Sequence, residues 1–202
     1  MEQKKDDKIY RSLAKVGRIL TVPPVMAAVF LLILWRYGEN VYHNASEFFF
    51  SVFFLGIMPV LAYAVHFIVP PFRKKGRGLQ RTMAFIFTFA GYLSAFLYGI
   101  LVKAGAGLRM VYCAYFFAAV LLSVVNYVFK KKASGHACSF IEPVIMLLLF
   151  SLPKWAVLFL AIGTISVWSS LSLKRHQPRE LFWGGCCSVA AAALAMMLYG
   201  KG

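Results

Sequence analysis

Residues 110–129 read MVYCAYFFAAVLLSVVNYVF, and residues 130–136, KKKASGH, follow them directly. The first stretch has no charged side chain, and it has about the length that an α-helix needs to cross the hydrocarbon core of a bilayer. The second stretch gathers three lysines, a Ser-Gly pair and a histidine where the apolar run ends. Together they predict a membrane-spanning helix that ends in a cationic loop.

Seven apolar runs of this kind are present, at 19–35, 48–69, 83–102, 110–129, 137–152, 155–173 and 181–199. Only 14% of the residues are charged, whereas a soluble domain carries about 25%. The runs lack the alternating polarity that is typical of barrel strands. The sequence therefore predicts an all-α fold, a polytopic transmembrane helix bundle of about six or seven spans over residues 19–200. The fifth run is short and ends before Pro153.

Residues 1–18 form a basic N-terminal tail that contains Lys4, Lys5, Lys8, Arg11, Lys15 and Arg18. Apolar residues alternate with these cations. One interpretation is an amphipathic helix that lies in the membrane interface. The other is a solvated basic tail.

The cations are unevenly distributed along the chain. The formal net charge is +15, and 17 of the 22 Lys and Arg residues lie in the tail and in the segments 70–82, 130–136 and 174–180. Because these cations occupy short loops between apolar runs, they favour membrane topology over nucleic-acid binding. We expect them on one face of the membrane, the cytoplasmic face, in an integral protein of a bacterial plasma membrane. The oligomeric state stays open.

The cysteines give no sign of a metal site. Cys113, Cys138, Cys186 and Cys187 lie in or beside apolar runs, and none has CxxC spacing. A zinc site or a disulfide framework is therefore not expected. We predict no metal and no other cofactor.

Three of the cation-rich segments also carry unusual polar residues. These segments are 74–82, 133–136 and 169–180, and two apolar runs separate each from the next. An even number of crossings returns the chain to the same side, so the topology predicts that the three segments meet there. They hold two of the four histidines, His136 and His176. Two imidazoles among cations suit phosphoryl transfer, in which positioning and stabilisation of negative oxygens dominate catalysis.

Helix starts next to both histidines strengthen this interpretation. Pro178 suits the first position of a helix, which would place Glu180 in the first turn. Its carboxylate could then reach back to His176 and fix the tautomer of the imidazole. Ser134 and Gly135 precede another apolar run, where the free N–H groups of a helix start can bind phosphate.

At these residues the sequence resembles the type 2 phosphatidic-acid phosphatase superfamily, integral-membrane lipid phosphatases that share their site with vanadium haloperoxidases. The family pattern is Lys-x6-Arg-Pro, then Pro-Ser-Gly-His, then Ser-Arg-x5-His-x3-Asp. Lys74 and Arg81 have the spacing of the first motif, Ser134-Gly135-His136 matches the second, and His176 with Glu180 keeps the spacing of the third. The resemblance covers about residues 74–185.

The resemblance implies a role for each matched residue. His176 would attack phosphorus and form a phosphohistidine, Glu180 would orient it, and His136 would protonate the leaving alkoxide. The phosphate oxygens would be held by Lys74, Arg81 and the backbone at Ser134 and Gly135. The substrate would be a lipid phosphate in the bilayer, such as phosphatidic acid, phosphatidylglycerol phosphate or a polyprenyl phosphate or diphosphate, and the reaction would need no metal.

The chain departs from the family pattern at four positions. Thr82 and Ala133 replace prolines, and Glu180 replaces aspartate. Ser170 stands where the family has an arginine that would bind phosphate. The cations that could supply the missing charge are Lys131, Lys132, Lys174, Arg175 and Arg179.

Two other functions remain open. A relative that binds anionic lipid headgroups without catalysis would also use the cationic loops, and in a small transporter or scaffold they would only set the topology. Glu142 is the only acidic residue inside an apolar run. An intramembrane carboxylate is costly, which makes it a further candidate for a functional residue.

Overall fold

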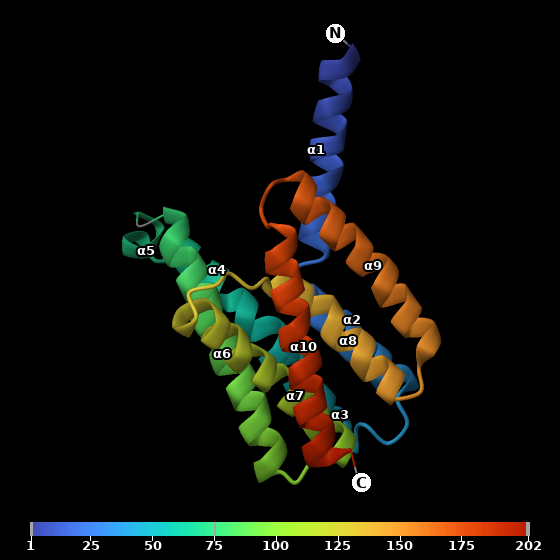
Figure 1. Ribbon diagram of the computed structural model, residues 1–202. Coiled ribbons are helices and arrows are strands. Elements are labelled where there is room, and N and C mark those ends of the chain that lie inside the picture. The colour runs from blue at the N-terminus through green and yellow to red at the C-terminus, as the bar shows by residue number, and fades with distance from the viewer. Residues whose placement is uncertain (1, 75, 201–202) are drawn as a thin grey trace.

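The computed structural model describes residues 2–74 and 76–200. All regular structure in this part of the chain is helical, which confirms the predicted all-α class. Figure 1 shows the helices packed side by side in a bundle, with α1 projecting beyond it. A helix satisfies its own backbone hydrogen bonds, which is what an apolar run needs where lipid offers no partner.

The elements are, in chain order, α1 (Glu2–Leu20), α2 (Pro23–Tyr37), α3 (Ala45–Ser51), η1 (Val52–Ile57), α4 (Met58–Ile68), α5 (Pro70–Lys74), α6 (Gly76–Leu101), α7 (Ala106–Ser123), η2 (Val124–Val128), α8 (Gly135–Leu149), α9 (Pro153–Ser172) and α10 (Pro178–Tyr199). The segments η1 and η2 are π-helical and continue the helices beside them. Pro59 follows η1 closely and has no backbone N–H, which accounts for a shifted hydrogen-bond ladder there.

Five helical segments in the described residues are long and apolar enough to cross a membrane: Ala45–Ile68, Gly78–Leu101, Ala106–Val128, Pro153–Ser172 and Pro178–Tyr199. A sixth would be the pair Tyr10–Leu20 and Pro23–Tyr37, which is bent by 54°. The remaining predicted run corresponds to α8, which is a shorter helix of 15 residues. The chain is thus a polytopic helical bundle with five or six candidate spans, against the expected six or seven.

The bend between α1 and α2 divides the predicted run at 19–35. The hydroxyl of Thr21 donates to the carbonyl of Gly17 at 2.9 Å, at the end of α1. The new helix starts at Pro23, and proline favours such a start because it has no N–H to leave unsatisfied. The side chains of residues 1–9 lie outside the described residues, so the amphipathic pattern predicted for the tail can be followed only from Tyr10. From there, Tyr10, Leu13 and Val16 are exposed.

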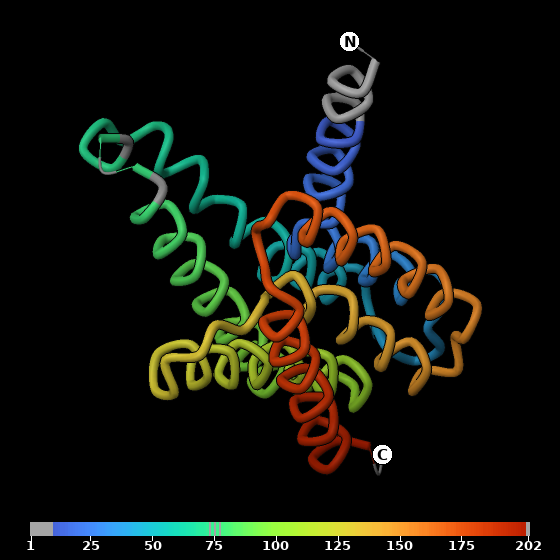
Figure 2. The backbone as a smooth tube through the Cα atoms, turned by 45° about the horizontal axis from the view of Figure 1, so that its top comes forward, coloured from blue at the N-terminus to red at the C-terminus, as the bar shows by residue number. Residues whose placement is uncertain are grey.

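Helix α7 lies at the centre of the core. Its residues Leu108, Val111 and Tyr112 are fully buried, and α10 packs along it. The hydroxyl groups of Tyr112 and Ser51 share a hydrogen bond of 2.6 Å, which satisfies both polar groups inside the bundle. The Cα trace in Figure 2 shows α10 running beside α8 as well.

The start of α8 is in close contact with α10 at Gly184. A Cβ atom at Gly184 would overlap the carbonyl oxygen of Ser134 and would lie 2.9 Å from Cβ of Ala137. The thiol of Cys138 also donates to the carbonyl of Gly184, at 3.1 Å. The missing side chain at Gly184 therefore lets the first turn of α8 lie directly on α10.

We expect Gly184→Ala to destabilise the protein by roughly 1–3 kcal/mol, because the new methyl group meets backbone that cannot move aside. The thermal midpoint in detergent micelles should fall by several degrees. Gly185→Ala is the matched control, since its Cβ would meet only the end of the Ile141 side chain, which can rotate away. Equal shifts for the two variants would contradict the close packing at Gly184.

Candidate functional site

The turn between α9 and α10 brings His176 to one end of the bundle. Lys174 adopts the left-handed conformation, with φ of 51°, and the N–H of Arg175 donates to the carbonyl of Ser170 at 3.0 Å. This pattern closes the last turn of α9 and reverses the chain. His176 follows directly, and α10 starts two residues later at Pro178.

His176 and Glu180 form a pair across the first turn of α10. Nδ1 of His176 lies 2.9 Å from Oε2 of Glu180, the contact that the spacing of the two residues predicts. An ionised carboxylate can only accept a hydrogen bond, so Nδ1 carries the proton of a neutral imidazole. The lone pair of Nε2 is then free, which is the state a nucleophilic histidine requires.

His136 lies beside His176 because two contacts fix the start of α8. The side chain of Asn126 accepts a hydrogen bond of 2.9 Å from the N–H of Ala133. The N–H of Ser134 donates to the carbonyl of Glu180, also at 2.9 Å. The ring centroids of His136 and His176 are 5.8 Å apart as a result.

One nitrogen of the His136 imidazole is left without a hydrogen bond among the described residues. Nε2 is buried and has no hydrogen-bond partner among the described residues. His136 precedes the apolar part of α8, and burial, with the positive charge of Arg18 and the nearby His176 as smaller causes, lowers its pKa to about 3. The ring is therefore neutral at pH 7. An anion placed beside it would oppose all these causes and favour the imidazolium.

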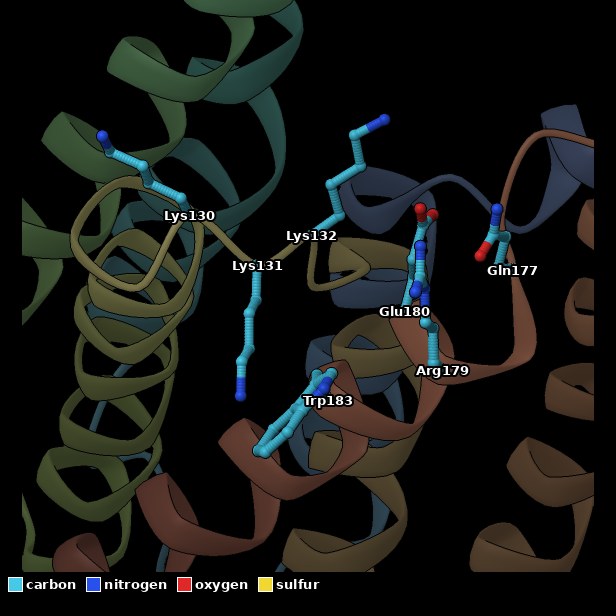
Figure 3. A pocket seen from close by; sticks show the side chains of 7 residues that line it. All are labelled: Lys130, Lys131, Lys132, Gln177, Arg179, Glu180 and Trp183. Carbon is cyan, nitrogen blue, oxygen red and sulfur yellow. The ribbon is translucent and has the colours of Figure 1, made fainter.

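A cavity of about 360 Å³ opens beside Glu180, the hydrogen-bond partner of His176. We call it the lysine cavity; its lining residues are Lys130, Lys131, Lys132, Gln177, Arg179, Glu180 and Trp183. Figure 3 shows that the three lysines point in different directions. The ammonium group of Lys131 lies 4.7 Å from the centroid of the Trp183 ring, a cation–π contact. Lys132 extends on the side of Glu180, and Lys130 points away from both.

A second cavity of about 360 Å³ lies where α1, α4, α6 and the turn after α9 meet. We call it the arginine cavity; its lining residues are Lys15, Arg18, Ile19, Tyr63, Gln80, Arg81, Leu173 and Arg175. Four of them are cations and none is a carboxylate. His176 lines neither cavity, but its two neighbours in the chain do: Arg175 lines this cavity and Gln177 lines the lysine cavity.

Among the residues that match the family motifs, Lys74 is the one that lies apart from the histidine pair and from both cavities. Arg81 and Arg175 share the arginine cavity, while Lys131, Lys132 and Glu180 share the lysine cavity. Lys74 lies at the end of α5, is exposed and lines neither cavity. Figures 1 and 2 show α5 at the tip of the α4–α6 hairpin, apart from the α9–α10 turn.

The first turn of α8 offers fewer free backbone N–H groups for phosphate binding than the motif predicts. The N–H of Ser134 is already donated to Glu180, so it is not free for a phosphate oxygen. What Ser134 offers instead is its hydroxyl, which is buried without a partner among the described residues. Gly135 faces open space, since a Cβ there would meet no atom within 4 Å.

Glu142 lies inside α8 and is 2% exposed. Neither of its carboxylate oxygens has a hydrogen-bond partner among the described residues, and neither does the hydroxyl of Ser188 on α10. Glu142 lines neither cavity. The predicted intramembrane carboxylate is thus buried, away from the two cavities.

Arg18 is the residue at this site that the sequence motifs do not indicate. One of its guanidinium nitrogens, Nη1, donates to the hydroxyl of Ser170 at 3.3 Å. Its only signal in the sequence is the small-residue spacing around it, with Ala14, Gly17 and Thr21 on the same face of α1.

In comparisons with known proteins, no family model, no curated protein and no solved structure matches this chain.

Proposed function

We propose that the protein is a membrane-embedded lipid phosphatase that hydrolyses a phosphate monoester or diphosphate of a lipid through a phosphohistidine. The observation that carries the proposal is the histidine pair. His176 is oriented by Glu180 at 2.9 Å, and His136 of α8 lies beside it with 5.8 Å between ring centroids. The resemblance to type 2 phosphatidic-acid phosphatases assigns the same residues to the same reaction.

The first step uses the free lone pair on Nε2 of His176. As this nitrogen bonds to phosphorus, the bond between phosphorus and the lipid oxygen breaks. The lipid oxygen takes a proton from His136, which is protonated once the phosphate dianion lies beside it. Glu180 stabilises the positive charge that develops on the ring of His176, as the third group of a triad does.

The second step returns the enzyme to its starting state. A water molecule attacks phosphorus and passes a proton to the now neutral His136. The bond between phosphorus and Nε2 breaks and its electron pair returns to the imidazole of His176. Phosphate then leaves with the proton that His136 took from water, so both imidazoles are neutral again. Arg81 and Arg175 of the arginine cavity stabilise the phosphate oxygens in both steps, because charge on those oxygens is what such a site must balance.

The substrate class follows from the surroundings of the site. Helix α8 begins beside His136, and α10 begins two residues after His176. Both helices continue into segments of apolar residues, so a lipid tail can lie along them while its phosphate meets the cations. Phosphatidic acid, phosphatidylglycerol phosphate and polyprenyl phosphates or diphosphates all fit this description. We place the site on the cytoplasmic face of a bacterial plasma membrane, because the cation-rich segments surround it.

The proposal is tested by offering the purified full chain, in detergent micelles, a panel of these lipid phosphates. We expect release of inorganic phosphate from at least one of them. Phosphatidylglycerol, a diester without a terminal phosphate, is the control and should release none. Binding of the panel lipids without hydrolysis would contradict the proposal and favour a headgroup-binding protein, and lipid flux across vesicles without hydrolysis would favour a transporter.

A further inference from the structure

The proposed reaction needs positive charge beside the last turn of α9, where α9 itself carries no cation. Ser170 occupies the position of the arginine in the family pattern, and it is fully buried in the last turn of α9. A hydroxyl there cannot balance the charge of a phosphate. The cations that follow Ser170 in the chain, Lys174 and Arg175, lie beyond the end of the helix and are exposed.

Arg18 provides a guanidinium at this place from the other end of the chain. Its Nη1 atom lies 3.3 Å from the hydroxyl oxygen of Ser170, although the two residues are 152 positions apart. Figure 1 shows the lower part of α1 beside the upper part of α9, and the two helices are in contact. In an arginine at position 170, Cγ would take the place of the hydroxyl oxygen that Arg18 now contacts.

Close packing of α1 on α9 produces this position. Ala14 and Thr21 are buried at 0% and 2% exposure, and a Cβ at Gly17 would lie only 3.1 Å from Cγ2 of Ile165. These residues recur at intervals of three and four, which places them on one face of a helix. Arg18 lies at the edge of that face, so its long side chain follows α9 to Ser170.

The charges around Arg18 indicate an anion. Arg18, Lys15, Arg81 and Arg175 line the arginine cavity together, and no carboxylate lines it. The ion pairs found among the described residues do not include Arg18. Like charges gathered in one cavity repel one another, and a phosphate dianion would remove that repulsion. Arg18 is also close enough to His136 to disfavour its charged form electrostatically.

We propose that Arg18 is a phosphate-binding residue of the active site, supplying from α1 the guanidinium that Ser170 lacks. This proposal rests on the proposed phosphatase function. Ser170 accepts one N–H of the guanidinium and orients it, which leaves the other N–H groups for two phosphate oxygens. The basic N-terminal helix is then part of the active site and is required for hydrolysis.

The decisive experiment moves the guanidinium from one helix to the other. In the full chain, Arg18→Ala should lower kcat/KM for the best lipid phosphate of the panel by roughly 100-fold or more, the usual loss when one charge-stabilising donor is removed. The double variant Arg18→Ala/Ser170→Arg should recover most of this loss, because its new arginine can fill the vacated space. Arg18→Lys should give an intermediate loss, since an ammonium cannot bind two oxygens side by side.

Arg11→Ala is the matched control, since Arg11 is an exposed arginine of the same helix and does not line the cavity. It should keep wild-type activity. Thermal midpoints identify any variant that has lost its fold. Activity of Arg18→Ala within twofold of wild type would overturn the proposal, and so would a folded Arg18→Ala variant that Ser170→Arg fails to rescue.

A second readout separates this proposal from the function on which it rests. If the wild-type chain hydrolyses no lipid phosphate, the proposed function fails, and binding of inorganic phosphate is measured by calorimetry in the same variants. A tenfold or greater loss of affinity in Arg18→Ala, restored by Ser170→Arg, would still establish Arg18 as the anion ligand. Equal affinities would overturn that role as well.

Discussion

Replacing His176 by alanine is expected to abolish phosphate release from every lipid phosphate that the wild-type chain hydrolyses. His176 is the nucleophile of the proposed reaction, and its loss should lower kcat by about 10,000-fold or more, as removal of the nucleophile from a catalytic unit does elsewhere. The protein should still fold, because the side chain of His176 is partly exposed and its hydrogen bond found among the described residues is to the nearby Glu180. When the reaction is run with radiolabelled substrate and then quenched, a phosphohistidine should be trapped in the wild type and none in the variant.

His43→Ala is the matched control for this prediction. His43 and Glu47 repeat the same spacing, and their side chains lie 3.6 Å apart. This pair lies at the opposite end of the bundle, at the start of α3, and the ring contact between two histidines found among the described residues is that of His136 with His176. We expect His43→Ala to keep the wild-type rate. Loss of activity in both variants, or in neither, would contradict the assignment of His176.

Replacing His136 by alanine is expected to lower activity in a way that depends on the leaving group. His136 donates the proton that an alkoxide needs in order to leave, and general acid catalysis contributes about 100- to 10,000-fold. Hydrolysis of a lipid phosphate should slow by that factor. Hydrolysis of p-nitrophenyl phosphate should slow by less than about tenfold, because nitrophenolate leaves readily without a proton.

The two histidines are thus distinguished by comparing two substrates. His176→Ala should lose both reactions, since the nucleophile is needed whatever group leaves. Equal losses on both substrates in His136→Ala would contradict its role as the acid and would leave it a merely structural residue. Burial lowers the pKa of His136, so its ring is neutral at pH 7 when the site is empty. The proton that His136 donates must therefore arrive with the phosphate.

The helices were predictable because the property that indicates them, a long run of apolar residues, lies within one segment of the chain. The run 110–129 has no charged residue and too few polar residues for an aqueous surface, and it forms α7 and η2. The bend between α1 and α2 was not predicted, although Pro23 and Pro24 were visible inside the run at 19–35. The contact of His176 with Glu180 belongs to the same local class, since four residues make one turn of a helix.

Other parts of the site were not predictable from spacing. Lys74 and Arg81 match one motif, yet only Arg81 lines the arginine cavity, because the tip of the α4–α6 hairpin carries Lys74 away from the bundle. Among the proposed substitutes for the charge missing at Ser170, Lys131 instead lies over the ring of Trp183. Each of these outcomes depends on where one helix meets another.

The sequence by itself determined that this chain is an all-α membrane protein, and that two histidines and a carboxylate gather among cations at helix ends. Composition and one-turn spacing are enough for that, because both act within a single segment. Only the tertiary structure decided that Arg18 reaches Ser170. That contact exists because Gly17 and its small neighbours let α1 lie directly on α9. Packing between the two helices decides which residue Arg18 contacts, and Ser170 lies 152 positions away in the chain.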